Sequence, residues 1–202
     1  MNKFPSVILF DLGGVLVDWD GVESLKKLSG GRLTTEMARR FWLESPSVNK
    51  FDTGRCTPQE FAVGVIEELN LSLDADDFLL QFESWDRGLL PGALGLLEKL
   101  RSRFVLACLS NNNELHWAAL RDKDGLDKQF DYCFISHEIG VIKPSEEAFL
   151  YVLKKIGRKA EEILFFDDNQ ECIDTAGKLG MSAFCISGVK GVESVLKKMK
   201  FI

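Results

Sequence analysis

Short runs of apolar residues alternate with amphipathic stretches along most of the chain. Five runs of four to six residues are continuously apolar: Ser6–Phe10, Phe104–Leu109, Tyr132–Ile135, Ile163–Phe166 and Ala183–Ile186. Such runs are typical of parallel strands that are buried on both faces. Amphipathic patterns between them predict helices at Pro91–Leu100, Glu146–Ile156 and Gln170–Leu179. Because strands and helices alternate, we expect an α/β fold with an open parallel sheet.

The chain after the first predicted strand departs from this alternation. From about Val22 to Gly88 the pattern predicts helices and no strand. Three helices are predicted there, at Thr34–Leu43, Thr57–Leu69 and Asp76–Trp85. We therefore expect an all-helical insert over residues 21–88, within an α/β core formed by residues 1–20 and 89–202. Open α/β sheets bind ligands at the carboxyl ends of their strands, so the insert is placed to act as a lid.

Composition and charge exclude several classes of function. Among the 202 residues, 31 are acidic and 25 are basic, and a net charge of −6 argues against a nucleic-acid-binding protein. Two histidines, His116 and His137, are too few for a three-histidine zinc site, and the five cysteines include no C-x-x-C pair. No apolar run approaches the roughly 20 residues that span a bilayer, and no signal peptide is visible. We expect a cytoplasmic protein with free thiols and no membrane partner.

The predicted strands end in side chains that suit phosphoryl transfer. The first strand is followed by Asp11, the second by Ser110 and the fourth by Asp167 and Asp168, while Lys143 follows the third. A carboxylate can act as nucleophile or metal ligand, and Ser and Lys side chains can neutralise phosphate oxygens. Two adjacent acids at the end of a buried strand are costly without a cation. This inventory predicts a site for a phosphorylated compound and a divalent metal.

Four segments, taken in their order along the chain, resemble the motifs of the haloacid dehalogenase (HAD) superfamily. The segments are Asp11-Leu12-Gly13, Leu109-Ser110-Asn111, Lys143-Pro144 and Phe165-Phe166-Asp167-Asp168-Asn169. The resemblance spans essentially the whole chain and points to the branch whose helical cap follows the first motif. That branch has a Rossmann-like core. The first motif is most similar to that of a subgroup that includes a bacterial α-D-glucose-1-phosphate phosphatase.

The resemblance implies a role for each matching residue. Asp11 would attack phosphorus and become an aspartyl phosphate. Ser110 and the backbone amide of Asn111 would bind the phosphoryl oxygens, and Lys143 would pair with Asp11 and the phosphate. The implied Mg²⁺ ligands are Asp11, the backbone carbonyl of Gly13 and Asp168, with Asp167 as a further ligand or as a partner of the ligands.

Gly13 departs from the pattern of ordinary phosphatases in this superfamily. They have an aspartate at this position, which protonates the leaving alcohol, and losing a general acid costs ~10²–10⁴-fold in rate. Three explanations are open. Asp18 or Asp20 could replace the missing acid, the substrate could have a good leaving group such as an anomeric sugar phosphate, or the activity could be vestigial. We favour a combination of the first two.

The leading hypothesis is therefore a Mg²⁺-dependent phosphatase of a small phosphometabolite, with a sugar phosphate as the substrate class. One alternative is a HAD scaffold that lost its acid and acts as a binding or regulatory protein. A haloacid dehalogenase also begins with an aspartate nucleophile but does not need the metal, and the retention of Asp167 and Asp168 argues against it. The sequence predicts neither the identity of the substrate nor the oligomeric state.

Overall fold

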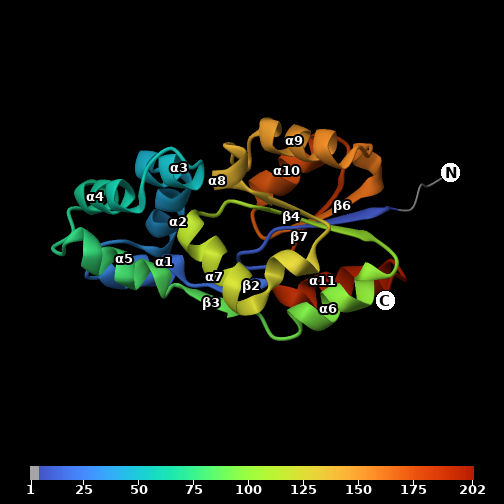
Figure 1. Ribbon diagram of the computed structural model, residues 1–202, viewed down its shortest axis with the longest axis horizontal. Helices are drawn as coiled ribbons and strands as arrows, with labels where there is room; N and C mark the ends of the chain where they lie inside the picture. Colours follow the sequence, from blue (N-terminus) through green and yellow to red (C-terminus); the bar gives the residue numbers. More distant parts are fainter. Residues whose placement is uncertain (1–4) are drawn as a thin grey trace.

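A five-stranded parallel sheet forms the centre of the computed structural model, which describes residues 5–202 (Figure 1). The strands run in the order β5-β4-β1-β6-β7, and every pairing between neighbours is parallel. Their bounds are Val7–Phe10 (β1), Val105–Ser110 (β4), Tyr132–Ile135 (β5), Ile163–Asp167 (β6) and Ser182–Cys185 (β7). Each strand matches a predicted apolar run to within one residue at either end, so the predicted α/β fold is confirmed.

Helices cover both faces of the sheet, which explains why its strands are continuously apolar. Ile8 and Phe10 of β1 belong to a buried cluster that includes residues of α6 and α11. Val7 and Leu9 point to the opposite face, into a cluster with α9 and α10. Figure 1 shows these two helix pairs on either side of the sheet. The four helices are Ala93–Arg101 (α6), Glu146–Ile156 (α9), Gln170–Lys178 (α10) and Gly188–Lys198 (α11).

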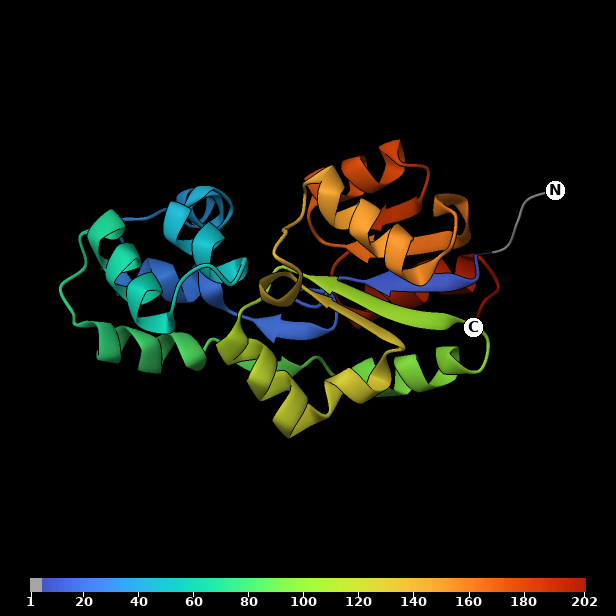
Figure 2. The same cartoon turned by 45° about the horizontal axis from the view of Figure 1, so that its top comes forward.

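Residues 21–83, called the helical segment below, form a second cluster of helices beside the sheet (Figure 2). Its helices are Gly21–Leu28 (α1), Thr35–Glu44 (α2), Pro46–Asp52 (α3), Pro58–Leu69 (α4) and Ala75–Glu83 (α5). They pack around a largely aromatic core in which the rings of Phe51 and Phe61 stack with centroids 4.4 Å apart. Helix α4 begins with a capping box formed by Thr57 and Glu60. The helical segment therefore has a hydrophobic core of its own.

Two short strands connect the helical segment to the sheet, and one of them contradicts the sequence analysis. Strand β2 (Val17–Trp19) and strand β3 (Asp86–Leu89) form an antiparallel pair, although no strand was expected between Val22 and Gly88. Strand β3 contains two charged residues and a glycine, so it lacks any apolar alternation. Its pairing with β2 joins residues that are far apart in the sequence, which a local pattern cannot indicate.

The remaining helices lie before or after individual strands of the sheet. Helix α7 (Glu114–Asp124) follows β4, and the short helix α8 (Ser136–Ile139) follows β5 directly. Single 3₁₀ turns precede β5 and β6 at Leu126–Gln129 and Ala160–Glu162. None of the helices in the described part of the chain has the length and apolarity that crossing a bilayer requires.

Candidate active site

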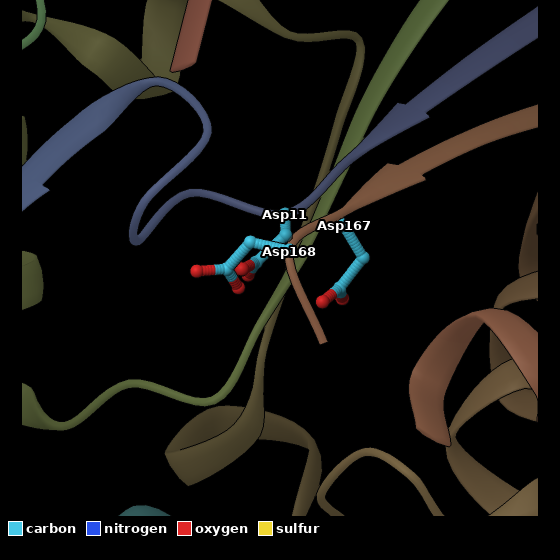
Figure 3. Close-up of side chains that lie close together, drawn as sticks. All are labelled: Asp11, Asp167 and Asp168. Carbon is cyan, nitrogen blue, oxygen red and sulfur yellow. The ribbon is translucent and has the colours of Figure 1, made fainter. Parts of the chain in front are cut away.

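Three aspartates meet where β1 and β6 end (Figure 3). Asp11 follows β1, Asp167 is the last residue of β6, and Asp168 comes next. Phe10 pairs with Phe166 in the sheet, which brings the following residues of both strands side by side. One carboxylate oxygen of each aspartate lies within 4.8 Å of those of the other two. The register of the central strands therefore builds the acidic cluster.

A buried lysine is held against this cluster. Lys143 Nζ lies 2.8 Å from Asp11 Oδ1 and 2.6 Å from Asp167 Oδ2, and the lysine side chain is 4% exposed. Asn111 fixes the backbone of Lys143, because its Nδ2 donates to the Lys143 carbonyl and its Oδ1 accepts from the Lys143 N–H, each at 2.8 Å. Asp167 Oδ1 accepts a further hydrogen bond from the Asn169 N–H at 2.8 Å. Lys143 is thus held both at its backbone, by Asn111, and at its ammonium group, by Asp11 and Asp167.

Burial and charge shift the ionisation of these groups. Burial raises the pKa of Asp11 to about 7, with Lys143 opposing the shift and the two other aspartates adding to it. Burial alone would lower the pKa of Lys143, but Asp11 and Asp167 outweigh it and raise that pKa above its ordinary value. Burial also raises the pKa of Asp168. Three carboxylates face one ammonium, so the ionised cluster has excess negative charge, and a hard divalent cation fits this oxygen donor set.

The glycine pair after Asp11 has unequal roles. Gly14 has a φ of 71°, and a Cβ on it would lie 2.4 Å from Asp168 Oδ2. A side chain at this position would therefore displace the carboxylate from the acidic cluster. A Cβ on Gly13 would contact only Trp19 Cβ, at 3.9 Å, which is an ordinary van der Waals distance. The close approach of Asp168 to the backbone thus requires Gly14 and not Gly13.

The acidic cluster opens into a cavity of about 920 Å³ between the sheet and the helical segment. All residues predicted for the site line this cavity: Asp11, Gly13, Ser110, Asn111, Lys143, Asp167 and Asp168. The helical segment contributes a second group of lining residues that includes Arg39, Trp42, Glu44, Asp52 and Phe82. The structure brings the predicted residues together, while the role of each of them stays a prediction.

Several residues of the cavity wall were given no site role from the sequence, among them Asp52, Asn113 and His116. Asn113 caps α7, because its side chain accepts from the His116 N–H at 3.1 Å. His116 is buried, its Nε2 lies 2.8 Å from the Phe82 carbonyl oxygen, and burial lowers its pKa to about 4, so it is neutral at pH 7. The run of three asparagines after Ser110 was a usable signal for Asn113. Nothing local marks Asp52, which ends a helix that was not predicted.

Comparisons with known proteins agree with this geometry. Residues 5–180 match a family model described as haloacid dehalogenase-like hydrolase. A phosphatase of Mycobacterium tuberculosis, MT3486, is 28% identical over 190 residues, covering 90% of this chain and 87% of the relative. A D-ribitol-5-phosphate phosphatase of Bacteroides thetaiotaomicron is 27% identical over 190 residues, covering 88% of this chain and 89% of the relative.

Solved structures support the same family. The HAD family enzyme bt-2542 of Bacteroides thetaiotaomicron, in complex with magnesium and inorganic phosphate, aligns with a TM-score of 0.72 and 26% identity. The alignment covers 92% of this chain and 95% of that structure. These comparisons support the superfamily that the motifs indicate, while the resemblance to a glucose-1-phosphate phosphatase stays a prediction. Because the family model matches most of its length, the chain belongs to the haloacid dehalogenase-like hydrolases.

Proposed function

We propose that the protein is a Mg²⁺-dependent phosphatase that hydrolyses a small phosphometabolite through an aspartyl-phosphate intermediate. The observation that carries this proposal is the cluster of three carboxylates within 4.8 Å of one another, with a buried lysine 2.8 Å from Asp11. A carboxylate nucleophile, a metal-binding acid pair and a fixed cation are the parts that phosphoryl transfer needs. The two relatives named as phosphatases support the same reaction class.

Each residue of the cluster has a place in this reaction. Asp11 would supply the oxygen that attacks phosphorus, and Lys143 would favour the ionised form of Asp11 and offset the charge of the phosphoryl group. Ser110 and the backbone N–H of Asn111 would bind phosphoryl oxygens. Mg²⁺ would be held by Asp11, Asp168 and the carbonyl of Gly13, and when bound it would neutralise negative charge on the phosphoryl group. Asp167 would orient Lys143, which it contacts at 2.6 Å, and complete the acidic surroundings of the metal.

Residues 21–88 would act as a cap domain that closes the cavity and selects the leaving group. Trp42 of α2 and Trp19 of β2 both line the cavity, with ring centroids 5.3 Å apart and the rings edge to face. Aromatic rings beside polar groups suit a ligand with both C–H faces and hydroxyl groups. We therefore propose a sugar or polyol phosphate as the substrate class, with an anomeric phosphate as one member.

The test is an assay of the purified protein with Mg²⁺ against a panel of sugar phosphates and acyl phosphates, beside an Asp11→Asn variant. We expect phosphate release that disappears with EDTA and in the variant, because both the metal and the nucleophile are required. A protein that binds phosphate analogues and turns over none of the panel would contradict the proposal. That result would favour the binding scaffold suggested by the absence of an acid at Gly13. Activity on haloacids that resists EDTA would instead indicate a dehalogenase.

A further inference from the structure

The reaction proposed above needs a proton for the leaving oxygen, and the structure argues against the two donors expected from the sequence. Asp18 is not among the residues that line the cavity. Asp20 lines it, but its carboxylate forms an ion pair with Arg87 and accepts a hydrogen bond from Ser24 Oγ at 3.0 Å. Asp20 is thus already engaged by a guanidinium and a hydroxyl group.

Asp52 is another carboxyl group on the cavity wall, and its surroundings differ from those of Asp20. It is the last residue of α3, is half-buried and lines the same cavity as Asp11. In the part of the chain that the structure describes, no cation lies within ion-pair distance of it. The nearby Arg55 is turned to other partners, since its Nε donates to Thr53 Oγ1 at 2.7 Å and its Nη2 to Asn49 Oδ1 at 2.6 Å.

Asp52 also interacts with the loop that joins β4 to α7, where residues 111–113 lie. Asn113 lies three residues after Ser110 and lines the same cavity, and hydrogen bonding by its side chain favours the charged form of Asp52, which lowers the pKa of that carboxyl group against the larger effect of burial. Asn113 Oδ1 already accepts from the His116 N–H, so its Nδ2 is the donor to Asp52. Three residues span at most ~10 Å of chain, so the carboxyl group is held close to the loop that would bind the phosphoryl group.

This environment also suits the chemistry of a proton donor. Burial raises the pKa of Asp52 to about 7, and the bond from Asn113 only partly opposes the shift. A group with a pKa near the working pH carries its proton in a large fraction of molecules and can still release it. Asn113 occupies one carboxyl oxygen as an acceptor, which leaves the other to carry the proton.

We propose that Asp52 is the catalytic acid that replaces the aspartate missing at Gly13; this inference rests on the proposed phosphatase function. As an oxygen of Asp11 forms its bond to phosphorus, the bond from phosphorus to the leaving oxygen breaks. The leaving oxygen keeps that electron pair and takes the proton of Asp52. In the second step the Asp52 carboxylate takes a proton from the water that attacks the aspartyl phosphate. This step releases inorganic phosphate and restores the Asp11 carboxylate and the protonated Asp52.

The test compares Asp52→Asn with the wild type on two substrates with different leaving groups. One is the sugar phosphate of the panel that the wild type hydrolyses fastest, whose alcohol leaves as a poor anion unless it is protonated. The other is acetyl phosphate, whose carboxylate leaves without a proton. The readout is kcat/KM, which reports the steps up to the release of the leaving group. We expect a loss of ~10²–10⁴-fold on the sugar phosphate and little change on acetyl phosphate.

Asp52→Asn is chosen because its amide oxygen can still accept from Asn113, so the contact between the helical segment and the loop is kept. Asp18→Asn is the matched control and should leave both values unchanged. An equal loss on both substrates, or no loss on either, would overturn the proposal, as would a selective loss in the Asp18→Asn control. A wild type that hydrolyses acetyl phosphate and no sugar phosphate would also overturn it. A wild type that hydrolyses neither would contradict the proposed function itself.

Discussion

Asn111 shows how a single residue of the site can serve two purposes. The motif resemblance implies that its backbone amide binds a phosphoryl oxygen, and the structure adds a task for its side chain. That side chain forms two hydrogen bonds with the backbone of Lys143, each 2.8 Å long. Lys143 then reaches both Asp11 and Asp167. The position of the ammonium is therefore set by a neighbouring strand end as well as by the carboxylates that it contacts.

The two glycines after Asp11 allow a prediction for a single residue of the site. Gly14→Ala should lower the stability of the protein by at least ~1 kcal/mol, because alanine disfavours the left-handed backbone at φ 71°. It should also reduce phosphatase activity and weaken Mg²⁺ binding, since the new Cβ would displace the Asp168 carboxylate. The measurements are urea denaturation, kcat/KM and titration with Mg²⁺.

Gly13→Ala is the matched control, because the same methyl group is added one residue earlier at a position with ordinary contacts. It should leave stability and Mg²⁺ affinity close to those of the wild type. Equal effects of the two substitutions would show that the close contact between Gly14 and Asp168 has no role in shaping the site.

The sequence was informative for residues that are fixed by their own strand. Asp11 and Asp167 could be placed at the site because each follows an apolar run directly, and parallel strands end at the same edge of a sheet. Asp52 could not be placed in this way. Asn113 and Asp11, which line the same cavity, are far away from it in the sequence, and the packing of α3 against α8, which follows β5, brings the three to one cavity.

The same contrast holds for whole elements. Helix α4 was predicted closely because its start is specified by local chemistry, namely the capping box of Thr57 and Glu60 with a proline at the first turn. Strand β3 was missed because its residues have no strand-like pattern and are held by pairing with the distant strand β2. Local signals thus predicted α4, whose start they specify, and failed for β3, which depends on its partner.

The capping box allows a prediction for α4. Thr57→Ala should destabilise the protein by ~1 kcal/mol or somewhat more, because the Glu60 N–H loses its acceptor and Glu60 loses a partner. Thr34→Ala removes a simple N-cap from α2, where the threonine accepts from the Met37 N–H at 3.1 Å, and should cost less. Thermal melts of both variants check the order, and a larger loss for Thr34→Ala would contradict it.

At the scale of the molecule, the cavity exists because the helical segment meets the core at a few close contacts. One of them joins α3 to α8, where a Cβ on Gly54 would lie 2.4 Å from the backbone oxygen of His137. Gly54 comes two residues after Asp52, so this contact also sets how far Asp52 stands from the strand ends. Arg39 of α2 also links the helical segment to the core. Burial raises the pKa of Asp168, and the charge of Arg39 lowers it by a smaller amount.

Gly54→Ala should therefore push the helical segment away from the core and lower kcat/KM for the preferred sugar phosphate. Gly31→Ala is a fitting control, because Gly31 also has a positive φ (76°, against 68° for Gly54) but has nothing within 4 Å of its built Cβ. Both variants carry a similar backbone cost of ~1 kcal/mol, so a difference between them isolates the contact with His137. If Gly54→Ala were as active as Gly31→Ala, the distance between the helical segment and the core at Gly54 and His137 would not govern catalysis.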